Sequence, residues 1–191
     1  PIKDALEIIV KEDQPEDTFT EAGICVDSIP ADNLVMKALR LMRTHYSFPP
    51  VEVHLLKKIP FGAGLGGGSA DAAFMLRLLN NTLALGVSDA GLAALAVQLG
   101  ADCPFFLYNR PVFASGIGEV FEDVSLSLSR YHFVLVKPDI HVSTQDAFAG
   151  ITPKEPQQSL KEIITKPVEE WKGLMVNDFE KSIFARHPQI R

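Results

Sequence analysis

A cluster of glycines between residues 62 and 68 constrains the fold of this chain more than any other feature. Five glycines fall within these seven positions, between an apolar strand-like run and a helix-like run. Glycine has no Cβ, so it can adopt positive φ and lets other groups approach the backbone closely. A loop just ahead of a helix offers free N–H groups and the positive end of the helix dipole to an anion. The segment therefore predicts a phosphate-binding loop, and a tight turn without a ligand is the alternative.

Composition narrows the class of protein. The 191 residues are 47% hydrophobic and 22% charged, which is typical of one globular domain or slightly more. The formal net charge is −6 without a basic face, so electrostatics do not favour a nucleic-acid partner. No apolar run approaches the roughly 18 residues of a membrane helix. The two cysteines, Cys25 and Cys103, form no disulfide or zinc pattern and favour a reduced, cytoplasmic protein.

The order of expected elements indicates an α+β fold. Helices are expected from a cap at Asp32, from a cap at Ser69, after Ser88 and at residues 144–148. Residues 159–187 are helical in pattern, with interruptions at Pro167 and Gly173. Strands are expected at residues 5–10, 23–26, 51–59, 111–114, 119–124 and 131–136, with 11–17 as a loop or hairpin tip. Strict strand–helix–strand alternation is absent. The pattern therefore favours helices packed on one face of a mixed or antiparallel sheet.

Two common phosphate-binding loops fit the glycine segment poorly. A Walker A loop requires a lysine before its final Ser or Thr, and Gly68 precedes Ser69 directly. The dinucleotide fingerprint G-x-G-x-x-G matches at Gly62, but it needs a second strand with an acidic residue about 20 positions further on. Asp89 lies near that distance, at the start of an expected helix. A nicotinamide site is therefore a weak alternative.

A different pattern carries a stronger resemblance. The segment at residues 60–70, Pro-Phe-Gly-Ala-Gly-Leu-Gly-Gly-Gly-Ser-Ala, resembles the second motif of the GHMP small-molecule kinases, which wraps the phosphates of ATP. Residues 59–73 most resemble the 4-diphosphocytidyl-2-C-methyl-D-erythritol kinases of the non-mevalonate isoprenoid pathway. Residues 32–38, 100–106 and 177–180 resemble further segments of the same family, in the same order.

The resemblance implies a fold and an activity. The fold would be the GHMP kinase fold, with a ribosomal protein S5 domain 2-like N-terminal domain over residues 1–130, without its first strands, and the start of a second α/β domain over 131–191. The activity would be ATP- and Mg²⁺-dependent phosphorylation of the 2-hydroxyl of a cytidine diphosphate-linked methylerythritol. The alternatives are another GHMP kinase, acting on homoserine, mevalonate or a sugar, and a non-catalytic nucleotide-binding module.

The resemblance also assigns site residues. The ATP-binding loop would comprise Pro60, Phe61, Gly62, Ala63, Gly64, Leu65, Gly66, Gly67, Gly68, Ser69 and Ala70. The Ser69 hydroxyl could bind phosphate or Mg²⁺, cap the following helix, or do both. Asp102 matches the family's catalytic aspartate and would act as general base toward the substrate hydroxyl. From its local sequence alone, Asp102 could equally be an Asx-turn residue.

Several further residues have two interpretations each. Asn33 matches an adenine-side residue of the family, or it is an N-terminal helix residue. Thr144 lies in a segment that is near the family's active site, or it caps a helix. Asp71 is expected to interact favourably with the dipole of its helix, and a role as metal ligand is the weaker alternative. Lys57 and Lys58 flank the loop and could meet phosphate or base, or lie at a solvated strand end.

The sequence also departs from the family pattern. The family's first-strand catalytic lysine, the Asp-Gly-Tyr-His segment after it and the third glycine-rich motif have no counterpart in the 191 residues. We therefore expect low or no kinase activity from these residues alone, which an ATPase-coupled assay at saturating ATP would test. Open sheet edges would favour association, for example as a homodimer.

Overall fold

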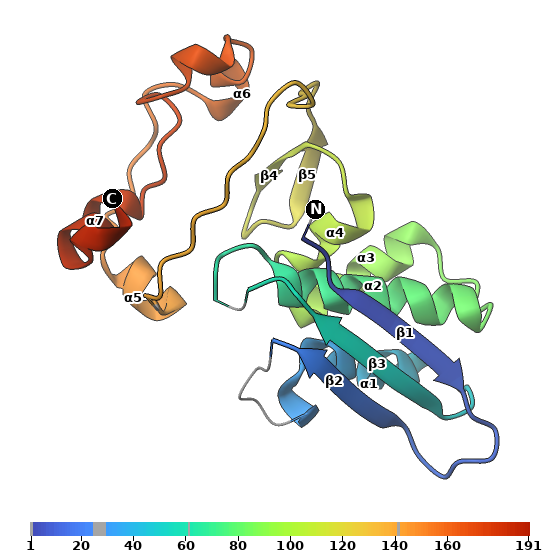
Figure 1. The fold of residues 1–191 in the computed structure, drawn as a ribbon. Coiled ribbons are helices and arrows are strands. Elements are labelled where there is room, and N and C mark those ends of the chain that lie inside the picture. The colour runs from blue at the N-terminus through green and yellow to red at the C-terminus, as the bar shows by residue number, and fades with distance from the viewer. Residues whose placement is uncertain (1, 25–29, 61, 141) are drawn as a thin grey trace. The chain divides into compact units, whose positions relative to one another are not determined.

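The structure is a computed structural model that describes residues 2–24, 30–60, 62–140 and 142–191. It divides into two compact units, one formed by Pro1–Arg110 with Ala114–Phe121 and the other by Pro111–Phe113 with Glu122–Arg191. The first unit holds a three-stranded sheet and its helices, and the second holds short helices joined by irregular segments (Figure 1). Within the described residues, no helix is long and apolar enough to cross a membrane.

The sheet of the first unit is mixed. It contains β1 (Ala5–Val10), β2 (Thr18–Gly23) and β3 (Val51–Lys57) in the order β1-β3-β2. The central strand β3 runs antiparallel to β1 and parallel to β2. The expected return strand thus begins earlier than residue 23, and it does not form a hairpin with β1 because β3 lies between them. Cys25 is outside the described residues.

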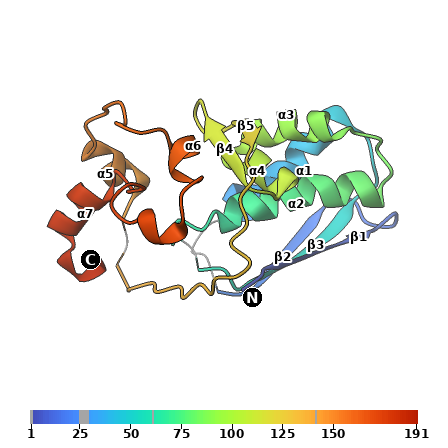
Figure 2. The same cartoon turned by 90° about the horizontal axis from the view of Figure 1, so that it is seen from above.

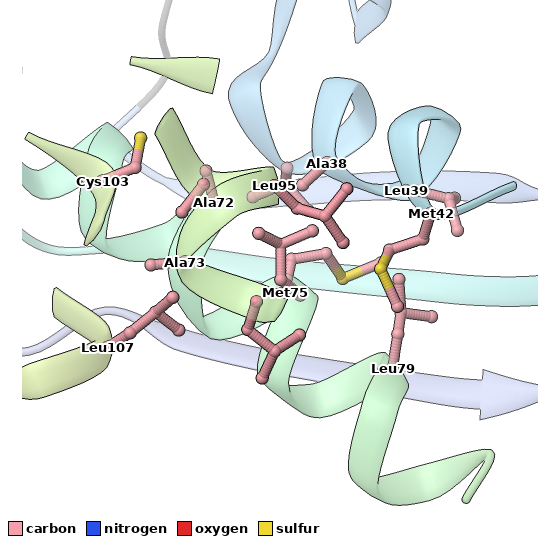
Figure 3. Packing of buried hydrophobic residues seen from close by; sticks show 14 of the residues in the cluster. Ala38, Leu39, Met42, Ala72, Ala73, Met75, Leu79, Leu95, Cys103 and Leu107 are labelled. Atoms are coloured by element: carbon pink, nitrogen blue, oxygen red, sulfur yellow. The ribbon is translucent and has the colours of Figure 1, made fainter. Parts of the chain in front are cut away.

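Helices cover one face of this sheet. The helices α1 (Leu34–His45) and α2 (Gly67–Thr82) lie on that face, and α3 (Asp89–Leu99) packs against both (Figures 1 and 2). Alternate residues of β3 point into the layer between sheet and helices, so Val51, Val53 and Leu55 are buried. Figure 3 shows the same core from α1 and α2, where Met42 and Met75 meet. This two-layer arrangement confirms the expected α+β fold.

Helix starts differ in detail from the expected caps. Asn33 caps α1 by accepting a hydrogen bond from the Val35 N–H at 2.9 Å, whereas Asp32 belongs to the short helix η1 (Pro30–Asp32). Gly66 occupies the cap position of α2, which places Ser69 inside the first turn. The expectation that Asp32 and Ser69 are caps was therefore wrong. Ser88 caps α3 as predicted, with its hydroxyl accepting from the Gly91 N–H.

The segment after α3 contains one helix that the sequence did not indicate. The helix α4 (Cys103–Tyr108) follows Asp102 directly, where a fixed turn was expected. The strands β4 (Val112–Ser115) and β5 (Val120–Asp123) then pair with each other in a separate two-stranded sheet, close to the expected ranges.

The rest of the chain has less regular structure than expected. The strand expected at residues 131–136 was wrong, because no described residue pairs with this segment, and Phe133 and Val134 are 79% and 87% exposed. The helix α5 (Thr144–Ala149) is present, with Ser143 as its cap. The helical pattern expected over residues 159–187, with interruptions at Pro167 and Gly173, is present as α6 (Leu160–Ile163), η2 (Val168–Glu170) and α7 (Glu180–Arg186), and η3 (Pro188–Ile190) follows.

Candidate active site

The glycine loop leads into the start of α2, whose first N–H groups have no acceptor within the helix. The first intrahelical bond runs from the Ala70 N–H to the Gly66 carbonyl, at 2.8 Å, so the N–H groups of residues 66–69 have no acceptor within the helix. Gly66 has φ +67° and lies in the left-handed region, where a side chain is strained. A Cβ at Gly66 would also come within 2.7 Å of the Phe106 ring. Glycine is thus required at the position where these donors emerge.

The next two glycines allow two further segments of the chain to approach the start of α2. A Cβ at Gly67 would lie 2.9 Å from Ile59, which follows β3. A Cβ at Gly68 would lie 3.5 Å from Leu34, the first residue of α1. The start of α1, and with it Asn33, is therefore brought next to the glycine loop.

Asp102 and the glycine loop line one pocket of about 270 Å³. Gly64, Leu65 and Gly66 contribute the loop side, and Asp102 contributes a carboxylate at the start of α4. The Asp102 side chain makes no capping hydrogen bond to α4 and is exposed. Local helix capping therefore leaves this carboxylate available to a ligand in the pocket.

An aromatic wall forms another side of the pocket. Phe105, Phe106 and Phe121 line it, and the first two meet edge to face with ring centroids 5.2 Å apart. Phe105 also meets Phe121 edge to face at 6.4 Å. The pocket thus combines residues of the glycine loop, one carboxylate and apolar rings.

A contact between Ser69 and Cys103 joins the first turns of α2 and α4. The buried Cys103 thiol hydrogen-bonds the Ser69 hydroxyl. Burial raises the pKa of this thiol, and the neighbouring Asp102 carboxylate raises it further. Cys103 therefore stays a neutral thiol at pH 7, and the contact holds the turn that carries Asp102 against the start of α2.

A buried ionic cluster lies at the base of the glycine loop. Lys57, the last residue of β3, places its ammonium group between the carboxylates of Asp4 and Asp71, with 2.7 Å to Asp71 Oδ2. The exposed fractions of the three side chains are only 6%, 5% and 9%. The other Asp4 oxygen accepts hydrogen bonds from the N–H groups of Lys58 and Ile59. The cluster thus connects β1, the entrance of the loop and α2.

Burial and ion pairing have opposite effects on the pKa values of the three residues in this cluster. Burial raises the pKa of Asp71 to about 6, although pairing with Lys57 lowers it. Burial also acts to raise the pKa of Asp4, but the hydrogen bonds from Lys57, Ile59 and Lys58 hold it below the ordinary value. For Lys57, burial acts to lower the pKa, and its two carboxylate partners outweigh burial and raise it.

Comparison with known proteins decides the family. A family model described as "GHMP kinases N terminal domain" matches residues 33–110. The 4-diphosphocytidyl-2-C-methyl-D-erythritol kinase of Parabacteroides distasonis is 56% identical over 190 residues, covering 100% of this chain and 69% of that protein. The chain belongs to the 4-diphosphocytidyl-2-C-methyl-D-erythritol kinase family. The kinase of the same name from Bacteroides fragilis is 52% identical over 191 residues, with 70% of its length covered.

Comparison with solved structures supports this family assignment. A crystal structure of 4-(cytidine 5'-diphospho)-2C-methyl-D-erythritol kinase superposes with a TM-score of 0.67 at 28% identity, covering 97% of this chain and 66% of that one. The homoserine kinase of Cytophaga hutchinsonii shares the fold, with a TM-score of 0.60 at 22% identity, over 85% of this chain and 54% of that one. The expected GHMP kinase fold is thereby confirmed.

The structure of this family member brings some predicted site residues together and not others. Asp102 and part of the predicted ATP loop share one pocket. Ser69 does not line it, but its hydroxyl hydrogen-bonds Cys103, the residue after Asp102. The Asn33 side chain caps α1 and donates to Glu21 at 3.4 Å. Thr144 begins α5 in the second unit, with its side chain outside the described part of the chain. Phe61 is also outside the described residues.

The buried cluster is the part of the site that sequence reasoning missed. The sequence left Lys57 either a phosphate or base contact or a solvated strand end, and it favoured a helix-dipole role for Asp71 over a metal ligand. Neither expectation included an ion pair, but both residues are buried and paired with each other. The signal was present in β3, because Lys57 shares the core-facing parity of Val51, Val53 and Leu55. A lysine on the apolar side of a strand predicts a buried carboxylate partner, since lysine is rarely fully buried unpaired.

We expect the titration of Asp71 to appear in the stability of the kinase. Its folded-state pKa of about 6 lies above the ordinary value of 3.8, so between these values the folded chain holds a proton that the unfolded chain has released. This contribution to the free energy of unfolding is greatest below about pH 4 and falls as the pH rises through 6. Relative to Asp71→Asn, which cannot titrate, the wild type should lose about 3 kcal/mol between pH 4 and pH 7.

Urea unfolding of both proteins at several pH values measures this difference. The pKa shifts of Asp4 and Lys57 do not contribute between pH 4 and pH 7. The lowered pKa of Asp4 keeps its carboxylate ionised above pH 4, and the raised pKa of Lys57 keeps its ammonium group charged below pH 7. A difference that stays constant from pH 4 to pH 7 would contradict the raised pKa of Asp71.

Proposed function

We propose that this chain forms the ATP-binding and phosphoryl-transfer site of a kinase that phosphorylates the 2-hydroxyl of 4-diphosphocytidyl-2-C-methyl-D-erythritol, in non-mevalonate isoprenoid precursor biosynthesis. The observation that carries the proposal is the single pocket shared by the glycine loop and Asp102. Phosphoryl transfer is mostly positioning and charge stabilisation, so it needs a phosphate cradle next to a group that handles the attacking hydroxyl. The pocket supports the proposal because it brings the glycine loop and a carboxylate together.

The phosphate side of the site would be the loop and first turn of α2. The N–H groups of residues 66–69 have no acceptor within the helix and lie at the positive end of a 16-residue helix. We propose that they bind the terminal phosphates of ATP, with residues 60–65 wrapping around them. Asn33, which caps α1 close to Gly68, is the proposed residue on the adenine side.

Asp102 would act on the substrate. Its side chain lines the same pocket as the loop residues and makes no capping hydrogen bond to α4, so it could accept the proton of a hydroxyl group placed between itself and the terminal phosphate. Phe105 and Phe106 shield one side of the pocket from water, which strengthens electrostatic interactions inside it. Thr144 in the second unit is the proposed residue on the substrate side, and residues 131–191 the proposed second domain.

Magnesium would be held mainly by the phosphates of ATP. The described residues contain no group of three or more His, Cys, Asp or Glu side chains that could form a metal site. This fits Mg²⁺, which usually keeps several waters and takes only one or two protein ligands beside phosphate oxygens. Ser69, in the first turn of α2, is the proposed protein ligand. The bound ion would neutralise charge on the phosphates.

The cellular setting follows from the chemistry of the substrates. ATP and a cytidine diphosphate-linked alcohol are small polar metabolites, and Cys103 is a buried free thiol. We therefore propose a cytoplasmic enzyme.

The test of the phosphate site is the variant Gly66→Ala. An alanine there must adopt a left-handed conformation that costs about 1 to 2 kcal/mol, and its Cβ approaches Phe106. We expect the dissociation constant for Mg·ATP, measured by calorimetry, to rise at least about tenfold.

The matched control is Gly86→Ala. Gly86 has φ +72°, and no atom lies within 4 Å of the position that an added Cβ would take, so the backbone strain is similar but lies beyond the other end of α2. It should leave ATP affinity unchanged. Wild-type protein that binds no ATP, or equal losses in the two variants, would contradict the proposed site. A substrate panel with homoserine, mevalonate and sugars then separates this activity from other GHMP kinases.

A further inference from the structure

The buried cluster of Lys57, Asp4 and Asp71 occupies a specific place relative to the glycine loop. Lys57 is the last residue of β3 before the loop, and Asp71 lies in the second turn of α2 after it. Their ion pair of 2.7 Å therefore joins the two ends of the segment that carries the proposed phosphate donors. Asp4 holds the entrance of the same segment through the N–H groups of Lys58 and Ile59.

Close packing surrounds this connection. A Cβ at Gly67 would lie 3.4 Å from Lys57 Nζ and 2.9 Å from Ile59 Cγ2, so the ammonium group and the loop entrance both contact the first residue of α2. Hydrogen bonds between charged groups are short and directional, whereas apolar contacts allow sliding. The cluster thus determines how far the end of β3 lies from the first N–H groups of α2.

Stability alone explains this cluster poorly. Burying three charged groups carries a desolvation penalty, and well-packed apolar residues of similar size are often equally or more stabilising. The same strand β3 uses apolar side chains at its other core-facing positions, Val51, Val53 and Leu55. The charged exception occurs only at the end that meets the loop.

We propose that Lys57, Asp71 and Asp4 are positioning residues for the phosphates of ATP, because they hold both ends of the glycine segment at the spacing at which the N–H groups of residues 66–69 converge. The inference rests on the proposed function. None of the three groups is available to touch the nucleotide, since their side chains are buried and bonded to one another or to the backbone. Their effect on ATP is transmitted through the backbone, where a displacement of about 1 Å can be costly to catalysis.

The variants Asp71→Ala and Asp71→Asn test the inference. Alanine removes the bond to Lys57, while asparagine keeps an oxygen that can accept from the ammonium group. We expect the dissociation constant for Mg·ATP to rise about tenfold or more in Asp71→Ala and to recover partly in Asp71→Asn. The KM for ATP should rise in parallel, while the KM for the alcohol substrate stays near the wild-type value. Asp4→Asn provides a second variant if Asp71→Ala does not fold.

The control for a purely structural effect is Arg43→Met. Arg43 pairs with Asp17 at 2.6 Å, and Asp17 in turn accepts from the Val51 N–H at the opposite end of β3. Arg43→Met should destabilise the protein without weakening ATP binding, when binding is measured well below the unfolding temperature of every variant.

Each outcome decides between the proposals. Wild-type affinity in Asp71→Ala or, if that variant does not fold, in Asp4→Asn would overturn the positioning role. An equal loss of affinity in Arg43→Met would also overturn it, because the effect would then follow from stability alone. Failure of the wild type and Arg43→Met alike to bind ATP would instead overturn the proposed function, and the positioning inference with it.

Discussion

Replacing Asp102 by asparagine should lower the rate of phosphoryl transfer by about 10²- to 10⁴-fold, the usual contribution of a general base. Asparagine keeps the shape of the side chain but cannot accept the hydroxyl proton. The exposed Asp102 side chain makes no capping hydrogen bond, so its loss should leave the free energy of unfolding near the wild-type value. ATP affinity should also persist, because the proposed phosphate donors are backbone groups of α2.

Single-turnover transfer of the γ-phosphoryl group, with protein in excess over ATP, measures this step even where overall turnover is slow. Asp89→Asn is the matched control, since Asp89 is an exposed aspartate in the first turn of α3, away from the pocket. It should transfer phosphate at the wild-type rate. If the Asp102→Asn variant kept more than about a third of that rate, Asp102 would not be the general base.

Replacing Lys57 by methionine should lower the free energy of unfolding by about 3 to 5 kcal/mol at pH 7. The change leaves Asp4 and Asp71 facing each other with exposed fractions of only 5% and 9% and no cation between them. Two buried carboxylates without a cation between them repel each other, so at least one is expected to bind a proton. The loss should therefore be smaller at pH 5 than at pH 7, because protonation relieves the repulsion. Urea unfolding at both pH values measures this effect.

Lys11→Met is the control for this effect. Lys11 pairs with Glu52 at 3.1 Å and, like Lys57, connects the chain of β1 with β3, but the two side chains are 32% and 27% exposed. A partly exposed pair of this kind contributes about 0 to 1 kcal/mol. If Lys57→Met lowered the free energy of unfolding no more than Lys11→Met does, the buried cluster would not stabilise the fold as its geometry implies.

Local signals were sufficient for the glycine loop and for most helices and strands. The alternation of β3 and the helical spacing after residue 67 each lie within one short window of sequence, so they predicted the elements that flank the loop. The resemblance to the GHMP kinases then led to Asp102, which the structure places in one pocket with Gly64 and Gly66. The catalytic role of Asp102 stays a prediction until the variant is measured.

Where sequence reasoning failed, a distant partner decided the outcome. Residues 131–136 have the composition of a strand, but a strand forms only when another strand supplies hydrogen bonds, and none does so in the described part of the chain. β2 follows β1 as the return strand of a hairpin would, yet β3 pairs with both. The helix at residues 103–108 was missed because Cys-Pro after Asp102 suggested a turn, although proline suits the first turn of a helix.

The sequence by itself determined that this chain has a glycine-rich loop between a strand and a helix, because glycine spacing and apolar periodicity are local properties. Only the tertiary structure decided which groups meet around that loop. Asp4, Lys57 and Asp71 are far apart or unremarkable in sequence, and burial together converts them into one ionic cluster. Asp102 likewise reaches the loop only because α4 packs against α2. Pairing and burial depend on long-range contacts that no short window of sequence contains.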